Sequence, residues 1–136
     1  MRIVPAVALL AALACGSDAP SGPTNANAAG TWALQTVNGI PLPYLYVQNG
    51  PDKGEVMADL LILTSAGTFT EKTTLRRTVN GQVTTEPQSD VGTFVISGNT
   101  VTFFFTIGGG SGVATLSGDS MTIPGDGGIV TRYAKQ

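Results

Sequence analysis

The chain has 136 residues, of which seven are basic and nine acidic, and its formal net charge is −2. This weak charge, without a basic stripe, gives no electrostatic reason to bind nucleic acid. The chain has no histidine and a single cysteine, which removes the commonest general base and transition-metal ligand and leaves no partner for a disulfide, so we expect no cofactor and no metal site.

The first 14 residues are typical of a removable secretory signal. Arg2 precedes an apolar run from Ile3 to Ala14, which is shorter than the roughly 20 residues that a membrane-spanning helix needs. The run leads into Leu13-Ala14-Cys15, which resembles the bacterial lipobox with Leu13 one place later than usual. The resemblance implies cleavage before Cys15 and lipidation of its thiol. The alternative is an ordinary secretory signal that is cut near Ala14 or Ala19.

Residues 15–29 are predicted to form a lipid-anchored, flexible linker, because they are small and polar, contain prolines and show no apolar periodicity. A lipidated Cys15 would place the protein in the bacterial cell envelope, with the membrane as a partner. Gly16 gives no clear signal for retention in the inner membrane, so we expect the outer membrane and a protein that faces the periplasm. The remaining residues, 30–136, are predicted to form one monomeric domain.

From Gly30 onwards the sequence predicts short strands and tight turns, with no helix. Asn38-Gly39 and Asn80-Gly81 are strong turn signals. We predict an all-β fold, an antiparallel meander of about eight strands that closes into a small barrel, because closure removes the exposed edges. A small β-sandwich is the alternative. The expected strands are 30–37, 55–63, 68–79, 82–85, 91–97, 100–107, 113–116, 120–123 and 128–133.

Two features of this domain resemble the lipocalin-like (calycin) families. The first is Gly30-Thr31-Trp32 on the first predicted strand, and the second is Arg132 on the last. The resemblance implies a lipocalin-like barrel in which Trp32 closes one end and Arg132 packs across its ring as a structural pair. The segment from Trp32 to Leu42 also resembles the start of bacterial META-type domains, which contain fewer strands and are a second alternative for the fold.

The segment Ile40–Gly54 is predicted to be a loop or an irregular edge, because it contains three prolines and proline cannot donate to a strand ladder. In lipocalin-like barrels the corresponding loop lies over the open mouth. Its apolar side chains could cover a ligand, or could plug a barrel that binds nothing, and the bulk of the inner side chains favours the plug. The candidate lid or ligand contacts are Leu42, Tyr44, Leu45, Tyr46 and Val47, with Phe69, Phe103 and Phe105 from the strands.

Two adjacent arginines, Arg76 and Arg77, are predicted to point to opposite faces of one strand. Arg76 should then be solvated. Arg77 should point towards the apolar row, where it could meet an anionic ligand head or pair with Glu71, and we favour the pair.

The sequence predicts no enzyme. It contains no histidine, no Gly-x-Ser-x-Gly, no thiol within the domain and no close carboxylate pair in an evident cleft. Two functions remain open. The first is a lipid-anchored barrel that holds a small hydrophobic ligand. The second is a structural or protein-interaction module of the cell envelope, with a filled barrel and an exposed apolar patch near Tyr44–Val47.

Overall fold

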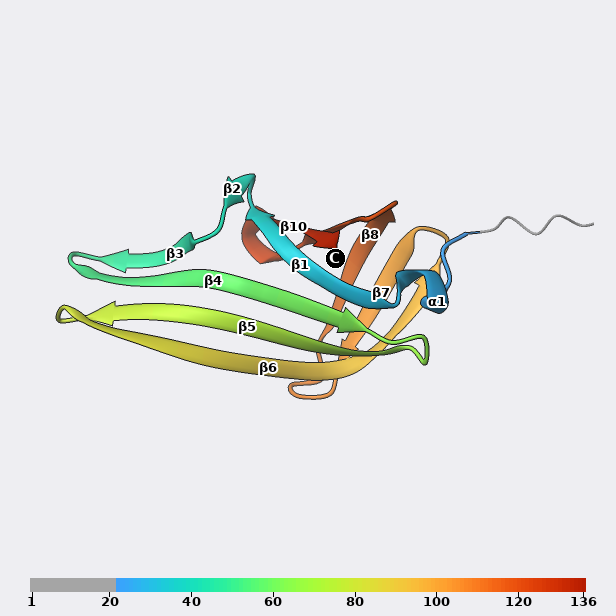
Figure 1. Ribbon diagram of the computed structural model, residues 1–136, viewed down its shortest axis with the longest axis horizontal. Helices are drawn as coiled ribbons and strands as arrows, with labels where there is room; N and C mark the ends of the chain where they lie inside the picture. The colour runs from blue at the N-terminus through green and yellow to red at the C-terminus, as the bar shows by residue number, and fades with distance from the viewer. Residues whose placement is uncertain (1–21) are drawn as a thin grey trace, which may run out of the picture.

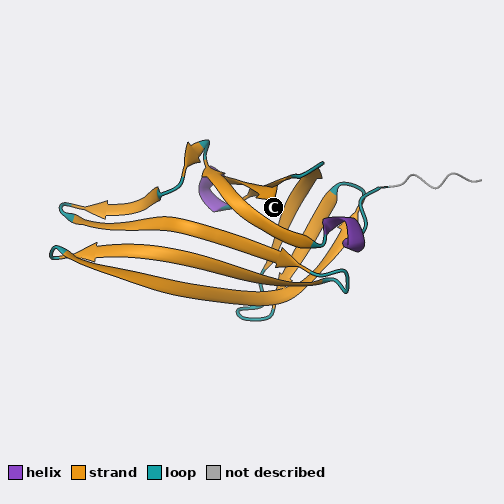
Figure 2. Ribbon diagram, viewed as in Figure 1, coloured by secondary structure: helices purple, strands orange, loops and turns teal. Residues whose placement is uncertain are grey.

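The computed structural model describes residues 22–136 (Figure 1), so the predicted signal at 1–14 and the lipidation site Cys15 lie outside the described residues. Strands dominate the described part of the chain, with one short α-helix and one 3-10 turn (Figure 2). The elements in chain order are α1 (Asn25–Ala28), β1 (Gly30–Val37), β2 (Ile40–Pro41), β3 (Tyr44–Asn49), β4 (Asp52–Leu63), β5 (Thr68–Val79), β6 (Gln82–Ser97), β7 (Thr100–Phe105), β8 (Ser111–Ser117), β9 (Ser120–Pro124), η1 (Asp126–Gly128) and β10 (Val130–Lys135).

Eight strands form a closed antiparallel barrel. The strands from β4 to β10 pair with their neighbours in chain order, β10 pairs with β1, and β1 pairs with β4 to complete the barrel. The closing pair joins Gly30–Ala33 of β1 to Leu60–Leu63 of β4. The predicted all-β fold, an antiparallel meander that closes into a small lipocalin-like barrel, is therefore confirmed in place of the β-sandwich.

For Ile40–Gly54 the expected loop was wrong, and the alternative of an irregular edge is confirmed, because β3 is the last strand of the sheet and its pairing with β4 is shifted between Leu45 and Val47. This segment forms β2 beside the end of β1, then β3, and then the start of β4. Two of its prolines lie where no ladder donor is needed, because Pro43 falls between β2 and β3 and Pro51 falls in the turn before β4. These two prolines therefore lie between strands and interrupt no strand pairing.

Residues 82–85 and 91–97, predicted as two strands, belong to the single strand β6. Pro87 lies in its middle, opposite Thr74 of β5. On the other side of β6, β7 pairs only with residues 92–97, so Pro87 sits at a free edge. A proline is tolerated at such an edge because its missing N–H has no acceptor to satisfy.

Strands β4, β5 and β6 continue beyond the barrel, with β3 added at the side of β4 (Figure 1). β4 pairs with β1 only over residues 60–63, and β6 pairs with β7 only over residues 92–97. The projecting part, residues 44–57 and 75–87, is therefore an open four-stranded sheet with free edges along β3 and the first half of β6. We call this part the arm.

The end of the barrel opposite the arm carries α1 (Figure 1). Oγ1 of Thr24 caps this single turn by accepting a 3.4 Å hydrogen bond from the backbone N–H of Asn27. Trp32 is 1% exposed and donates from Nε1 to the carbonyl oxygen of Ala28 at 2.8 Å. The prediction of a flexible linker up to residue 29 was therefore wrong for α1, which packs against the barrel end through the buried Ala28.

Candidate functional site

Three phenylalanine rings fill the middle of the barrel. Phe69 of β5 packs edge-on against Phe103 and Phe105 of β7, with ring centroids 5.2 Å apart in both pairs. Gly92 of β6 makes room for the Phe69 ring, because a Cβ atom at Gly92 would lie 2.6 Å from Cε1 of Phe69. Phe69 and Phe103 are buried, and Phe105 is half-buried. The centre of the barrel is therefore packed with side chains.

A cavity of about 260 Å³ lies beside these rings. It lies where the seam of the barrel opens, because β1 and β4 stop pairing beyond Ala33 and Leu60. Asp59 is the next residue of β4 and lines the cavity. The lining residues combine aromatic and aliphatic groups with a few polar ones and include neither lysine nor arginine: Asp59, Leu61, Glu71, Phe103, Phe105, Gly112, Ile123, Thr131 and Tyr133.

Two carboxyl groups face this cavity from neighbouring strands. In the β4–β5 ladder Leu61 lies opposite Glu71 and Asp59 lies opposite Thr73, which makes Asp59 and Glu71 diagonal neighbours on the inner face. Asp59 is only 8% exposed, and its Oδ2 accepts a 2.9 Å hydrogen bond from the Tyr133 hydroxyl. Among the described residues its buried Oδ1 accepts no hydrogen bond while both carboxyls are ionised, and the neighbouring Glu71 carboxyl can hydrogen-bond to Asp59 when it carries the proton. Such an atom is costly to bury, so Asp59 is disposed to accept a further donor.

Among the described residues, no cation balances the two carboxyls of the barrel interior, and their protonated forms are therefore favoured. Burial raises the pKa of Asp59, although the hydrogen bond from Tyr133 opposes this shift. Burial and then the charge of Asp59 raise the pKa of Glu71 to about 7, and Asp90 of β6 adds to the increase. Burial and the two carboxylates raise the pKa of the Tyr133 hydroxyl, which therefore stays protonated and donates to Asp59.

The sequence-based expectation that no close carboxylate pair exists was wrong. The signal for each residue was present, because Glu71 falls in the inward row of Phe69 and Leu75, and Asp59 falls in the row of Leu61. An acidic residue at an inward position is unusual in a strand that is otherwise apolar on that face. The register between β4 and β5, which brings the two carboxyls together, has no signature in the sequence.

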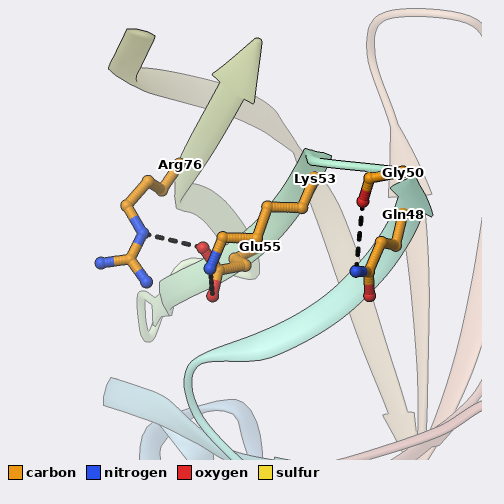
Figure 3. A network of polar contacts seen from close by, with 5 residues as sticks. All are labelled: Gln48, Gly50, Lys53, Glu55 and Arg76. Carbon is orange, nitrogen blue, oxygen red and sulfur yellow. Dashed lines mark hydrogen bonds and ion pairs between the residues drawn. The ribbon is translucent and has the colours of Figure 1, made fainter. Parts of the chain in front are cut away.

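The arm carries its own ion pairs (Figure 3). Glu55 accepts from Nε of Arg76 at 2.9 Å and from Nζ of Lys53 at 3.2 Å. The hydrogen bond from Arg76 is the main cause that lowers the pKa of Glu55, so this carboxyl stays ionised. Arg76 is therefore paired, where a solvated side chain was expected.

Arg77 points to the other face of the arm and forms its ion pair with Glu86 of β6, with Nε and Oε2 3.2 Å apart. The expected pair between Arg77 and Glu71 was wrong. Both arginines of β5 thus have acidic partners on the arm. Among the described residues, Glu71 forms no ion pair, and the charge of the cavity carboxyls stays uncompensated.

The predicted lid residues do not line the cavity. Leu42 and Tyr44 are half-buried and pack against the core. Leu45, Tyr46 and Val47 lie on β3 at the edge of the arm and are 44%, 42% and 52% exposed. Tyr46 and Val47 line a separate groove of about 190 Å³ on the arm instead. The apolar segment is therefore part of an exposed sheet edge.

The expected pairing of Trp32 with Arg132 was also wrong. Trp32 closes the end of the barrel that carries α1, and the cation over its ring is Lys135, whose Nζ lies 5.7 Å from the ring centroid. The register of β1 with β10 explains the exchange, because Lys135 lies opposite Trp32 whereas Arg132 lies opposite Thr36. Arg132 is exposed. Trp32 therefore has a cationic partner, but this partner is Lys135, three residues after Arg132 on β10.

No family model, curated protein or solved structure matches the chain. Within residues 22–136, no helix has the length and apolar character that crossing a bilayer requires. The same residues bring together no group of three or more side chains that could hold a metal ion. The cavity and its carboxyl groups are thus the features that bear most directly on function.

Proposed function

We propose that the protein is a binding protein of the bacterial cell envelope, whose barrel holds one small and mostly apolar molecule. The cavity beside Phe103 and Phe105 carries this proposal, because it combines an apolar lining with the unpartnered Oδ1 of Asp59. Ligand sites are typically concave and apolar, with a few convergent polar groups that fix the orientation of the ligand. Titratable groups with perturbed pKa values cluster at such sites.

The size of the cavity limits the ligand. Drug-sized ligands occupy sites of about 300–1,000 Å³, whereas this cavity measures about 260 Å³. The rings of Phe103 and Phe105 supply one wall, and the Phe69 ring packed against both of them prevents deeper entry. The filled core and a bound ligand are thus compatible, since each occupies a different part of the barrel. We propose binding without catalysis, because neither histidine nor cysteine is present among the described residues.

The proposed location rests on the N-terminal sequence. Leu13-Ala14-Cys15 resembles a lipobox, and lipidation of Cys15 would anchor the protein, by our proposal in the outer membrane and facing the periplasm. The described chain enters the barrel through α1, at the end opposite the arm (Figure 1). An anchor on this side would leave the arm and the mouth of the cavity free. The barrel and Trp32 at its end also support the proposed kinship with lipocalin-like proteins.

Two mass measurements test the proposal. Native mass spectrometry of the protein released gently from its host membranes should show a bound molecule small enough for the cavity, which denaturation should release. Intact-mass analysis of the same sample should show a chain that begins at an acylated Cys15. A ligand-free barrel that takes up no apolar probe would overturn the binding proposal, and an unmodified Cys15 would overturn the anchor.

The arm favours a second candidate function, which is contact with another envelope protein. It has two free sheet edges, and five of its apolar side chains are at least 42% exposed, namely Leu45, Tyr46, Val47, Val79 and Val83. Exposed apolar patches and unpaired edges are common features of interaction sites. Photo-crosslinking from position 47 in the host membrane would test it, with position 126 on η1 as the control. Equal crosslinking from both positions would exclude a specific arm contact.

A further inference from the structure

We infer that the ligand carries a protonated amine, which is held between Asp59 and Glu71, and an apolar body, which lies against Phe103 and Phe105. This inference rests on the proposed binding function and names its ligand class. Three observations carry it: the unpartnered Oδ1 of Asp59, the uncompensated second carboxyl beside it, and the aromatic lining of the same cavity.

The charges around the site favour a cation over every other head group. Asp59 faces it from β4, Glu71 from β5 and Asp90 lies opposite Glu71 on β6, while β10 supplies the neutral Tyr133 and Thr131. No lysine or arginine of residues 22–136 lines the cavity. A carboxylate or phosphate head would meet only like charge here, and like charges that face each other away from water are strongly unfavourable.

An ammonium group also matches the hydrogen-bonding needs of the two acids. It offers three donors and no acceptor, whereas a hydroxyl offers one donor. Oδ2 of Asp59 is taken by Tyr133, so an ammonium would donate to the buried Oδ1 and to Glu71, in place of the hydrogen bond that a protonated Glu71 makes to Asp59. Hydrogen bonds between an ammonium and a carboxylate are about twice as strong as neutral ones. The pair would therefore discriminate an amine from an alcohol of the same shape.

The aromatic wall suits the rest of such a molecule. The rings of Phe103 and Phe105 line the cavity together with the aliphatic Leu61 and Ile123. A cation near an aromatic face is attracted to it, and an apolar body gains from leaving water. At about 30 Å³ per atom, the share of one water molecule in the liquid, the cavity of about 260 Å³ holds roughly nine non-hydrogen atoms. A phenylethylamine or a short alkylamine has this size.

A proton shared by the two carboxyls is the competing explanation for the unpartnered oxygen. Closely spaced carboxyls often keep one proton between them, and the raised pKa of Glu71 would fit that state. A shared proton would satisfy Oδ1 and reduce the charge of the pair from −2 to −1, so the preference of the cavity for an amine over an alcohol would shrink. A metal ion is a weaker competitor, because the described residues bring together no three histidine, cysteine, aspartate or glutamate side chains that could hold one. Binding selectivity therefore decides between the explanations.

The decisive experiment compares three probes of similar size. The purified full-length mature protein is titrated by calorimetry with 2-phenylethylamine, 2-phenylethanol and phenylacetate at about pH 8, where both carboxyls ionise most readily. We expect the amine to bind at least about tenfold more tightly than the alcohol, and phenylacetate not to bind. At about pH 5 the amine should bind about tenfold more weakly, because the carboxyls then take up protons.

Charge-matched variants localise the effect. Glu71→Gln should weaken amine binding at least about tenfold and leave alcohol binding nearly unchanged, because it removes the charge and keeps the size of the side chain. Asp59→Asn should also weaken amine binding at least about tenfold. If Asp59→Asn does not fold, the Glu71→Gln variant alone tests the inference. Glu86→Gln on the arm and Asp126→Asn on η1 remove the same charge outside the cavity and should leave amine binding unchanged.

Each outcome has a separate meaning. Equal binding of the amine and the alcohol would overturn the amine inference and leave the binding function intact. An amine effect that the Glu86→Gln control shares would also overturn it, since the attraction would then be a general surface effect. Absence of amine binding, with the amide signals of Phe103 and Phe105 unmoved in NMR spectra, would overturn it as well, while the native mass measurement judges the binding function independently.

Discussion

The hydroxyl of Tyr133 donates a 2.9 Å hydrogen bond to Oδ2 of Asp59 across the interior of the barrel, between residues 74 positions apart. The bond joins β10 to β4 just beyond the point where β1 and β4 stop pairing. It therefore ties the barrel together where the backbone ladder no longer does. The same bond occupies Oδ2 of Asp59 and leaves Oδ1 as the oxygen that has no donor among the described residues. One contact therefore both closes the barrel and fixes the carboxyl group at the cavity.

Replacing Tyr133 by phenylalanine should destabilise the protein by about 1–3 kcal/mol, because Oδ2 of the buried Asp59 would lose the donor that the Tyr133 hydroxyl supplies. The loss should be larger at about pH 8 than at about pH 4, since an ionised carboxylate suffers more from the missing donor than a neutral acid. Urea unfolding at the two pH values, followed through the fluorescence of Trp32, measures both effects.

Tyr46→Phe is the matched control for this variant. Tyr46 lies on the exposed edge of the arm and makes no side-chain hydrogen bond among the described residues. Loss of its hydroxyl should change the free energy of unfolding by less than about 0.5 kcal/mol. Equal losses in the two variants would show that the bond between Tyr133 and Asp59 contributes nothing specific.

Glu71→Gln should make the protein more stable at about pH 8 and flatten its dependence on pH. Glu71 has a pKa of about 7 in the folded protein, against an ordinary value of 4.5. Below about pH 4.5 the folded and the unfolded chain both carry this proton, so the shifted pKa does not affect stability there. Above this pH the unfolded chain releases the proton first, and the free energy of unfolding falls until the pH exceeds the folded pKa of about 7. For a largely buried but coupled group this cost is on the order of 1–3 kcal/mol.

Unfolding free energies measured between about pH 4 and about pH 8 test this sign. The original protein should lose stability across the interval, and the Glu71→Gln variant should lose less. Glu86→Gln, whose carboxyl pairs with Arg77 on the surface, should follow the original protein closely. A stability profile that rises with pH in the original protein, and that Glu71→Gln leaves unchanged, would refute the assigned shift.

The strand pattern was largely predictable from sequence because its signals are local. β1 and β5 have the predicted bounds, and the turns at Asn38-Gly39 and Asn80-Gly81 follow from residues that readily adopt positive φ angles. Closure into a barrel follows from the number of consecutive antiparallel strands. These features depend on neighbours in the chain, which the sequence displays directly.

The site was not predictable, because it depends on register. Arg132 and Lys135 both lie near the end of the chain, and only the pairing of β1 with β10 assigns Lys135 to Trp32. The diagonal placement of Asp59 and Glu71 likewise depends on the β4–β5 register between the turn at 64–67 and the bulge that separates Val56 from Ala58. A shift of one residue would turn either carboxyl to the outside.

Lys135→Met should destabilise the protein more than Arg132→Met. Nζ of Lys135 lies over the Trp32 ring and donates a 2.6 Å hydrogen bond to the carbonyl oxygen of Asn27 in α1. Losing these contacts should cost about 1–2 kcal/mol, whereas the exposed Arg132 should cost less than about 0.5 kcal/mol. Hydrogen exchange at Ala28 and Ala29, whose amides bond within the α1 turn, should speed up only in Lys135→Met. The opposite ranking would restore Arg132 as the partner of Trp32.

Gly92→Ala should be the most damaging of these small changes. A Cβ atom there would collide with the backbone carbonyl of Phe104 on β7 and would lie 2.6 Å from Cε1 of Phe69. Neither neighbour can move freely, because one belongs to the β6–β7 ladder and the other is held between two phenylalanine rings. Overpacking of this kind costs about 1–3 kcal/mol and occasionally more, and we expect the upper end.

Gly54→Ala on the arm is the matched control for Gly92→Ala. Its Cβ atom would meet the side chains of Tyr46 and Val47, at 2.6 Å from the Tyr46 hydroxyl oxygen and 2.8 Å from Cγ1 of Val47. Both side chains are about half exposed and can turn outwards, so the cost should stay below about 1 kcal/mol. Urea unfolding ranks the two variants. If Gly54→Ala were the more destabilising, the close packing of Phe69 on β6 would not limit the barrel interior as proposed.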